Sequence, residues 1–230
     1  MKKRNWRLML RRVLNLVFSR LVITVTLVLL QVFWLFSVFH WLEVNITVPE
    51  VWVHCHLDDL IPFCKYAVIP YLAWFIWIPF TLFYLLWKAP RADFWRLCLP
   101  LFAGMTIALA VYVILPNGLD LRPYRVYGSD IFARIVRLLY STDTATCPSI
   151  HVFNSVTLMM AYYRSRIFEE PRRRWMRPAS AVLCLSIIAS TVLLKQHSCI
   201  DVVMGILLAM AVDSAASSLE RSESRILQNP

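Results

Sequence analysis

The chain has 230 residues, of which 59% are hydrophobic, and its mean hydropathy is +0.60. This composition is too apolar for a soluble domain of this size and predicts one all-α, polytopic membrane domain over residues 1–230. The formal net charge of +10 comes from basic residues in short clusters between apolar runs, as topology signals are distributed. We therefore expect the bilayer as a partner and no nucleic acid, and the oligomeric state stays open.

The chain begins with a basic segment, residues 1–20, followed by a long apolar run. The run from Leu21 to Leu42 is longer than the apolar core of a cleaved signal peptide and lacks a cleavage site of small residues. We therefore expect a cytoplasmic N-terminus and a first membrane span over this run. The basic residues ahead of it include Lys2, Lys3, Arg4, Arg7, Arg11 and Arg12.

The segment from Glu43 to Lys65 contains several carboxylates and few cations, so we expect it on the extracytoplasmic side. It holds a group of potential metal ligands, but their spacing matches no zinc motif. We therefore favour an interfacial loop or short helix at headgroup level over a metal site. The potential ligands are His54, Cys55, His56, Asp58, Asp59 and Cys64.

Two further spans are predicted next. The second runs from Tyr66 to Trp87, with expected kinks at Pro70 and Pro79 and with Trp74 among the candidates for an aromatic belt. The third runs from about Leu97 to Leu115. The positive-inside rule places the basic connection between them in the cytoplasm. Its basic residues are Lys88, Arg91 and Arg96.

The longest segment between spans, Pro116 to Thr146, contains an amphipathic pattern from Ser129 to Tyr140. Its apolar residues recur at helical spacing, and Ser129 or Asp130 is a suitable N-cap. We expect a helix that lies along the membrane surface. Two arginines on its polar side, Arg134 and Arg137, are expected to be solvated or to contact lipid phosphates.

Three spans complete a predicted bundle of six transmembrane helices. The fourth begins at residues 147–151 and ends near Tyr163, the fifth covers Pro178 to Leu194, and the sixth covers Cys199 to Ser217. Residues 218–230 form a predicted cytoplasmic tail. An arginine-rich connection between the fourth and fifth spans marks the cytoplasmic side. Its arginines are Arg164, Arg166, Arg172, Arg173, Arg174 and Arg177.

Three short motifs carry the chemistry. In Cys147-Pro148-Ser149-Ile150-His151 a histidine follows a turn where a helix begins, and the free N–H groups and positive dipole of a helix start favour a phosphate beside it. His197 and Asp201 are four residues apart, which on a helix pairs an imidazole with an orienting carboxylate. Arg122 supplies a guanidinium suited to bidentate phosphate recognition.

In order, these motifs resemble the three signature blocks of the type 2 phosphatidic acid phosphatase superfamily of integral membrane lipid phosphatases and phosphotransferases, over about Leu115 to Gly205. The second block, Pro-Ser-x-His, matches fully. The third, Ser-Arg-x5-His-x3-Asp, has Thr191 in place of its arginine, and the first, Lys-x6-Arg-Pro, has Leu115 in place of its lysine. The matching residues are Arg122, Pro123, Pro148, Ser149, His151, Ser190, His197 and Asp201.

The resemblance implies a role for each matching residue. His197 would attack phosphorus and form a phosphohistidine, Asp201 would hold its tautomer, and His151 would protonate the leaving alkoxide and later activate water. No cofactor and no metal is expected, because hydrogen-bond donors already in place meet the charge. Candidate substitutes for the two missing cations are Lys195, which is one helical turn from Thr191, and Arg125 or another arginine of a loop. The expected phosphate-binding residues are Arg122, Ser149, the backbone of Ile150, Ser190 and Lys195.

The implied function is hydrolysis of a phosphate ester of a membrane lipid, either phosphatidate-type or polyprenyl phosphate. The predicted topology places the site on the outer face of a plasma membrane, such as the bacterial inner membrane. Two alternatives stay open. One is a lipid phosphotransferase of the inositolphosphoryl-ceramide synthase type, which the Cys-Pro-Ser-x-His form resembles. The other is a non-catalytic lipid-binding membrane protein.

The predicted topology also sorts the six cysteines. Cys98 and Cys184 fall within spans and are expected to be buried thiols. The other four lie on the predicted oxidising side, where disulfides form. Among these we expect a bridge between Cys55 and Cys64, with Cys147 and Cys199 as the remaining candidates.

Overall fold

The computed structural model describes residues 20–45, 48–141 and 147–228, and the chain divides into two compact units, Met1–Trp41 and Leu42–Pro230. Helix α2 (Arg20–Asn45) provides the described part of the first unit and contains the predicted first span, Leu21 to Leu42. The predicted basic N-terminus lies outside the described residues, except for Arg20.

The described part of the second unit is mostly helical with almost no strand, which confirms the all-α prediction. Its two strands are only two residues long and pair in parallel, with Val51 opposite Asn117 and Trp52 opposite Gly118. The elements are β1 (Val51–Trp52), α3 (His56–Leu60), η1 (Lys65–Ala67), α4 (Val68–Lys88), α5 (Arg91–Ile114), β2 (Asn117–Gly118), α6 (Ile131–Leu139), α7 (Ile150–Arg164), η2 (Arg166–Phe168), α8 (Met176–Leu193) and α9 (Cys199–Gln228).

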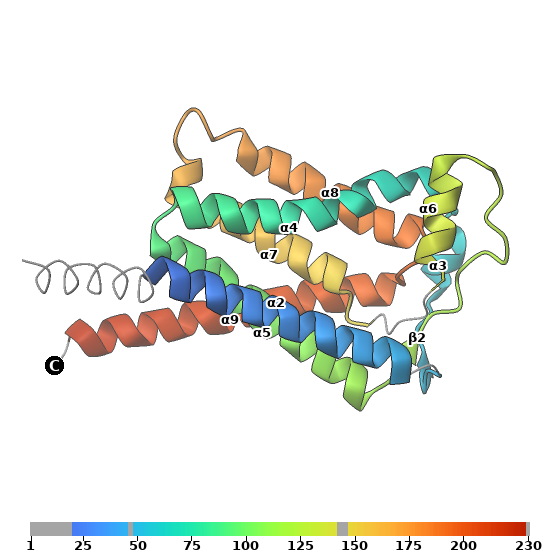
Figure 1. The fold of residues 1–230 in the computed structure, drawn as a ribbon, viewed down its shortest axis with the longest axis horizontal. Coiled ribbons are helices and arrows are strands. Elements are labelled where there is room, and N and C mark those ends of the chain that lie inside the picture. The colour runs from blue at the N-terminus through green and yellow to red at the C-terminus, as the bar shows by residue number, and fades with distance from the viewer. Residues whose placement is uncertain (1–19, 46–47, 142–146, 229–230) are drawn as a thin grey trace, which may run out of the picture. The chain divides into compact units, whose positions relative to one another are not determined.

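Helix α7 is the centre of this bundle, because α4, α5, α8 and α9 all pack against it (Figure 1). Nearly every residue in its first two turns is buried, including Phe153 and Leu158. Two glycines allow its neighbours to approach closely. A Cβ on Gly104 of α5 would lie 2.0 Å from the Phe153 ring, and one on Gly205 of α9 would lie 2.8 Å from the carbonyl oxygen of Ser149.

Five helices among the described residues are long and apolar enough to cross a membrane. The predicted fourth span is the exception, because α7 has 15 residues and is therefore about 22 Å long, against ~30 Å for a hydrocarbon core. Helix α7 is instead enclosed by longer helices. The candidate spans are Thr24–Leu42, Lys65–Lys88, Arg91–Ile114, Met176–Leu193 and Cys199–Leu219.

Several predicted boundaries differ from the observed ones. Helix α5 begins at Arg91, so Arg91 and Arg96 belong to the helix rather than to the connection, because Pro90 is tolerated as its N-cap. Pro70 lies in the first turn of α4, where its missing N–H leaves no helical hydrogen bond unmade, whereas Pro79 lies inside the helix. Helix α9 continues through the predicted tail to Gln228, because residues 218–228 contain neither glycine nor proline.

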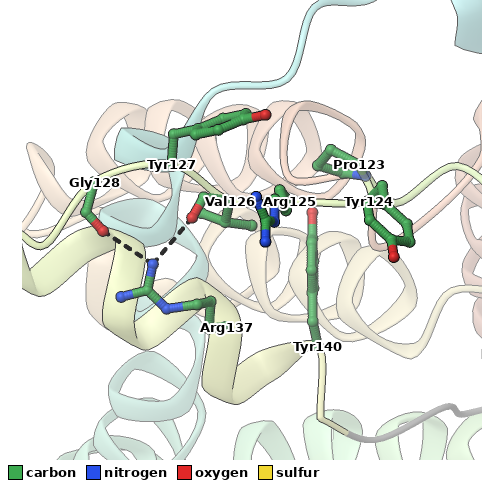
Figure 2. A pocket seen from close by; sticks show the side chains of 8 residues that line it. All are labelled: Pro123, Tyr124, Arg125, Val126, Tyr127, Gly128, Arg137 and Tyr140. Carbon is green, nitrogen blue, oxygen red and sulfur yellow. Dashed lines mark hydrogen bonds between the residues drawn. The ribbon is translucent and has the colours of Figure 1, made fainter.

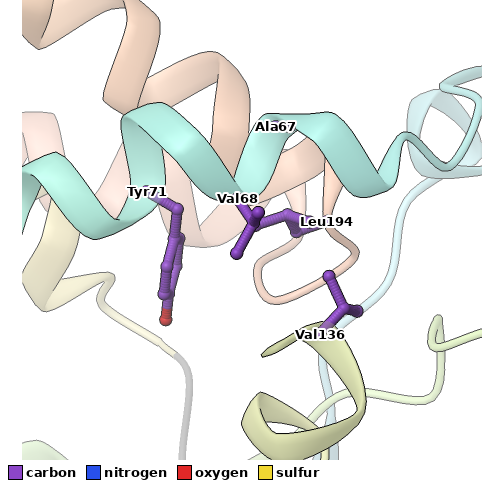
Figure 3. Packing of buried hydrophobic residues seen from close by; sticks show 5 residues of the cluster. All are labelled: Ala67, Val68, Tyr71, Val136 and Leu194. Carbon is purple, nitrogen blue, oxygen red and sulfur yellow. The ribbon is translucent and has the colours of Figure 1, made fainter. Parts of the chain in front are cut away.

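Helix α6 confirms the predicted amphipathic helix, and Asp130 is its N-cap, accepting from the N–H of Ala133 at 3.1 Å. Its apolar side chains divide into two groups. Val136 packs against the start of α4 and the turn after α8, whereas Ile131 and Leu138 are exposed (Figure 3). The helix is therefore anchored to the protein as well as free to contact lipid. The buried cluster comprises Ala67, Val68, Tyr71, Val136 and Leu194.

The two ends of α7 are each fastened to α9. At its C-terminus Arg164 forms a two-pronged ion pair with Asp213. At its N-terminus the backbone N–H of Ser149 donates to the carbonyl of Asp201 at 3.2 Å. The starts of α7 and α9 and the short helices α3 and α6 gather at one end of the bundle, opposite the α4–α5 and α7–α8 connections (Figure 1).

Candidate active site

The turn that leads into α7 is held by side chains from α5 and β2. The Tyr112 hydroxyl donates to the carbonyl of Pro148 at 2.6 Å. The Asn117 amide spans Cys147, donating to its carbonyl at 2.9 Å and accepting from its N–H at 2.8 Å. Ser149 then caps the helix by accepting from the N–H of Val152 at 3.3 Å. This network fixes where the first turn of α7 begins.

His197 and Asp201 interact as their spacing predicts, although His197 lies just before α9. The Nδ1 of His197 lies 3.3 Å from Asp201 Oδ2, and its Nε2 lies 3.4 Å from Nδ1 of His151. The same Asp201 oxygen accepts from the N–H of Ser198 at 3.0 Å. The carboxylate therefore orients one imidazole, and that imidazole faces the second, which comes from α7.

His151 lies in an aromatic surrounding provided by α4. Its ring centroid is 4.6 Å from that of Tyr71, in a stacked arrangement, and 4.4 Å from that of Trp74. Phe75 approaches edge-on at 6.2 Å. Trp74, predicted as a belt residue, therefore packs against a candidate catalytic histidine. The apolar rings exclude water from one side of the imidazole.

Several buried nitrogen atoms around the histidine pair have no hydrogen-bond partner within the described structure. They are Trp74 Nε1, His151 Nε2 and Gln196 Nε2. A buried polar group without a partner costs about 1–3 kcal/mol. Trp74 packs against His151 and Gln196 adjoins His197, so a polar ligand or water molecules bound beside the histidines would supply the missing partners.

Arg122 reaches this site from the loop before α6. Its Nη2 lies 3.4 Å from Oε1 of Gln196, and its guanidinium carbon lies 5.1 Å from the centre of the Tyr140 ring. Gln196 immediately precedes His197, so the guanidinium is held next to the histidine pair. The sequence-predicted cation is therefore brought to the site.

The other predicted phosphate ligands have local partners. The hydroxyl of Ser190 donates to the carbonyl of Ile187 at 2.6 Å and is buried in α8. Lys195 has a positive φ of 52°, and its ammonium donates to the carbonyl of Asp58. The spacing argument for Lys195 assumed a helix continuous with Thr191, but α8 ends at Leu193. One N–H of the Lys195 ammonium is therefore committed to Asp58, and only its other two could reach a phosphate.

The sequence pattern did not indicate that Asp58 would contact the start of α9. Its Oδ2 accepts from the N–H of Cys55 at 2.8 Å and from the hydroxyl of Ser198 at 2.6 Å, and its Oδ1 accepts from the N–H of Cys199 at 2.7 Å. Burial alone would raise the pKa of Asp58, but the hydrogen bonds from Ser198, Cys199 and Cys55 lower it to about 2. The carboxylate is therefore ionised and fixes the start of α9.

Cys147 lies near the site but is not a candidate nucleophile. Burial, with a contribution from the carboxylate of Asp201, raises the pKa of the Cys147 thiol to about 12. Only a thiolate attacks efficiently, and this thiol stays protonated at neutral pH.

The expected bridge between Cys55 and Cys64 is not formed, since all six cysteines are free thiols.

An open hollow of about 490 Å³ lies beside the site, along the loop that follows Arg122. Figure 2 shows Arg137 at its rim, donating to the carbonyls of Val126 and Gly128, each at 3.0 Å. This guanidinium therefore holds the loop in shape. The hollow is lined by Pro123, Tyr124, Arg125, Val126, Tyr127, Gly128, Arg137 and Tyr140.

These features define an all-α membrane protein whose polar residues converge on a pair of histidines, of which His197 is buried and His151 half-buried. The model of the PAP2 superfamily matches residues 98–223, more than half of the chain, and the chain belongs to this superfamily. Its members are in general phosphatases. The matched range includes Arg122, His151, His197 and Asp201. No curated protein and no solved structure matches the chain significantly.

Proposed function

We propose that this protein hydrolyses the phosphate ester of a membrane lipid through a phosphohistidine intermediate. The observation that carries the proposal is the alignment of Asp201, His197 and His151 at the starts of α9 and α7, with contacts of 3.3 and 3.4 Å between successive side chains. The substrate would be a phosphatidate-type lipid or a polyprenyl phosphate. The reaction needs a nucleophile, a proton donor and phosphate ligands, and this group of residues provides each.

The first step is transfer of the phosphoryl group to His197. Asp201 accepts a hydrogen bond from Nδ1–H of His197, which directs the lone pair on Nε2 away from the carboxylate. Because Nε2 lies 3.4 Å from Nδ1 of His151, the bound phosphate would have to enter between the two imidazoles before Nε2 attacks phosphorus. The bond from phosphorus to the lipid oxygen breaks, and protonated His151 gives its proton to that oxygen. The lipid alcohol leaves, and His197 carries the phosphoryl group.

The second step returns the enzyme to its starting state. His151, now neutral, accepts a proton from a water molecule while the water oxygen attacks phosphorus. The bond between phosphorus and Nε2 of His197 breaks, and inorganic phosphate is released. The short separation of the two imidazoles supports a shared role, because one group serves the leaving and attacking oxygens at the same phosphorus.

Neutral hydrogen-bond donors would bind the phosphate in place of the family's lysine and arginine, whose positions are occupied here by Leu115 and Thr191. The first N–H groups of α7, including that of Ile150, are not used by the helix and face a phosphate bound at its start. Ser149 adds a hydroxyl group and Arg122 adds a guanidinium, and Ser190 would join them only by giving up its hydrogen bond to Ile187. We assign the indole N–H of Trp74 and the amide N–H groups of Gln196 as further donors, since both nitrogen atoms are buried without a partner in the described structure.

The site would face the outside of a plasma membrane. The α7–α8 connection at the opposite end of the bundle holds many of the arginines, and basic connections favour the cytoplasm. A lipid headgroup in the outer leaflet would then reach the histidine pair from the side of α3 and α6. Helix α6, with exposed Ile131 and Leu138, is suited to contact the same leaflet.

The test is a phosphate-release assay with purified protein in detergent. The panel contains phosphatidate, phosphatidylglycerophosphate and polyprenyl mono- and diphosphates, each with and without a lipid alcohol as acceptor. Release that needs no acceptor and is lost in His197→Ala supports the phosphatase. The exposed His54→Ala is the matched control. Turnover that requires the alcohol indicates the phosphotransferase, and no turnover with any lipid indicates a non-catalytic lipid-binding protein.

A further inference from the structure

A second polar cluster lies beside the histidine pair and takes no part in the proposed reaction. The sulfur atoms of Cys55 and Cys199 and one carboxylate oxygen of Asp58 all lie within 4.8 Å of one another. Cys55 is the N-cap of α3, and Cys199 is the first residue of α9. Residues far apart in the chain are therefore brought together at the end of the bundle that carries the site.

The carboxylate of Asp58 holds the two cysteines in this arrangement. It accepts the backbone N–H of Cys55 at 2.8 Å and that of Cys199 at 2.7 Å, so both main chains bind the same group. Ser198 and Lys195 add a hydroxyl contact to the carboxylate and an ammonium contact to the carbonyl of Asp58. Four hydrogen bonds to oxygen atoms of Asp58 therefore hold the segments that carry the two sulfurs close together.

Two products are compatible with this donor set, a bound metal ion and a disulfide. A metal ion would need the carboxylate of Asp58 as its third ligand, in competition with the N–H and hydroxyl groups that already occupy it. A disulfide uses only the two sulfurs and leaves every one of these hydrogen bonds in place. The geometry therefore favours the bond between the sulfurs.

We propose that Cys55 and Cys199 are a site of oxidative modification and form a disulfide that fastens α3 to the first turn of α9. Each thiol gives up one proton and one electron, and a disulfide-bearing oxidant of the thiol oxidase or oxidised glutathione class is reduced to two thiols. Formation of the bond requires a rotation of the side chains that brings the sulfurs from within 4.8 Å of each other to ~2.05 Å. The bond closes a very long loop of the chain, which restricts the unfolded state strongly.

The bond would also act on the neighbourhood of the active site, because Cys199 is two residues from His197 and from Asp201. It would hold the start of α9 in place independently of Asp58. This inference does not depend on the proposed phosphatase reaction. It requires only that this end of the bundle meets an oxidising compartment.

The direct test is a map of the disulfides in the full-length protein. Cells are lysed in an alkylating reagent without reductant, and the protein is purified, digested and examined by mass spectrometry. We expect a linked pair of peptides containing Cys55 and Cys199, which separates on reduction. Cys64→Ser and Cys147→Ser should keep this linkage, whereas Cys55→Ser and Cys199→Ser should each leave the partner thiol open to alkylation.

A stability measurement covers the case in which a single substitution prevents folding. Reductant should lower the temperature of unfolding of the wild-type protein but not that of the double variant Cys55→Ala/Cys199→Ala. Alkylation of both cysteines in protein treated with oxidised glutathione would overturn the proposal. So would a linkage of Cys55 to Cys64 or to Cys147, or one equivalent of zinc that is retained by wild type and lost in Cys55→Ser.

Discussion

The backbone N–H of Ser149 donates to the carbonyl of Asp201 at 3.2 Å, which ties the residue before α7 to the first turn of α9. The two candidate catalytic histidines lie on either side of this contact, His151 after Ser149 and His197 before Asp201. A displacement of either helix start would therefore change the separation of the imidazoles. The reactive geometry depends on main-chain contacts as well as on the side chains that perform the chemistry.

Replacement of His197 and replacement of His151 should affect turnover in different ways. His197→Ala should abolish turnover and any acid-labile phosphoenzyme, because the proposed nucleophile is gone. His151→Ala should slow hydrolysis of an alkyl phosphate far more than that of an aryl phosphate, whose leaving group needs little protonation. The measurement is the ratio of kcat/KM for the two substrates, together with mapping of trapped phosphate. Phosphate found on His151 would reverse the assigned roles.

Asp201→Asn should lower kcat by a factor on the order of 10⁴, the scale observed when the carboxylate of a catalytic triad is neutralised. The amide retains the size of the side chain but no longer selects the Nδ1–H tautomer of His197. Steady-state kinetics on the folded variant give the factor. Asp213→Asn is the comparison within the same helix, since Asp213 pairs with Arg164 at the far end of α7. An equal loss of kcat in both variants would argue for a structural effect alone.

Asp58 should make stability depend on pH in the acid range. Its pKa is lowered from 3.8 to about 2, so its contribution to stability is complete above pH 3.8 and is lost as the pH falls towards 2. Asp58→Asn should remove this dependence and lower the free energy of unfolding by about 2 kcal/mol, through lost charge-assisted hydrogen bonds. Thermal unfolding in detergent between pH 2 and 7 measures both effects. The exposed Asp59→Asn should leave the acid part of the profile, below about pH 4, unchanged.

Trp74 and Gln196 should contribute to phosphate binding through neutral N–H groups. Trp74→Phe keeps an aromatic ring against His151 and removes the indole N–H, and Gln196→Leu removes the amide. Each should weaken inhibition by inorganic phosphate about 10-fold, the effect of a hydrogen bond worth about 1.4 kcal/mol. Trp77→Phe, a buried change in the same helix, should leave inhibition unaltered. Unchanged phosphate inhibition in both test variants would exclude them as ligands.

Much of the fold follows from local patterns in the chain. Long apolar runs identified the five helices that are long enough to cross a membrane, although the predicted fourth span is too short. The spacing of His197 and Asp201 identified their contact. The environment of His151 did not follow, because Tyr71 and Trp74 lie in another helix and an aromatic residue in a span has many uses. The contacts of Asp58 were equally hidden, since a carboxylate in a loop shows no periodicity. Lys195 departed from expectation because helix α8 ends earlier than the spacing argument assumed.

The orientation of the bundle is open to a direct measurement. Reporter fusions at Asp130 and Arg172 should report opposite sides of the membrane, with Asp130 outside. The short α7–α8 connection concentrates arginines, whereas the longer segment around α6 spreads its arginines among aspartates. Both reporters are read in the same host with an enzyme active only outside and another active only in the cytoplasm. A cytoplasmic reading at Asp130 would move the candidate site to the other face and exclude an outer-leaflet substrate.

Gly205 sets a limit on how the site can vary. A single methyl group there would meet the carbonyl of Ser149 at 2.8 Å and Val152 at 3.0 Å, at a position that belongs to no proposed ligand set. The methyl group of alanine at position 205 would push the starts of α7 and α9 apart. We expect this to separate the imidazoles of His151 and His197 while every reactive group stays present. A protein with all its catalytic side chains intact could thus be inactive. The presence of the motif residues alone is therefore an insufficient criterion for activity in related chains.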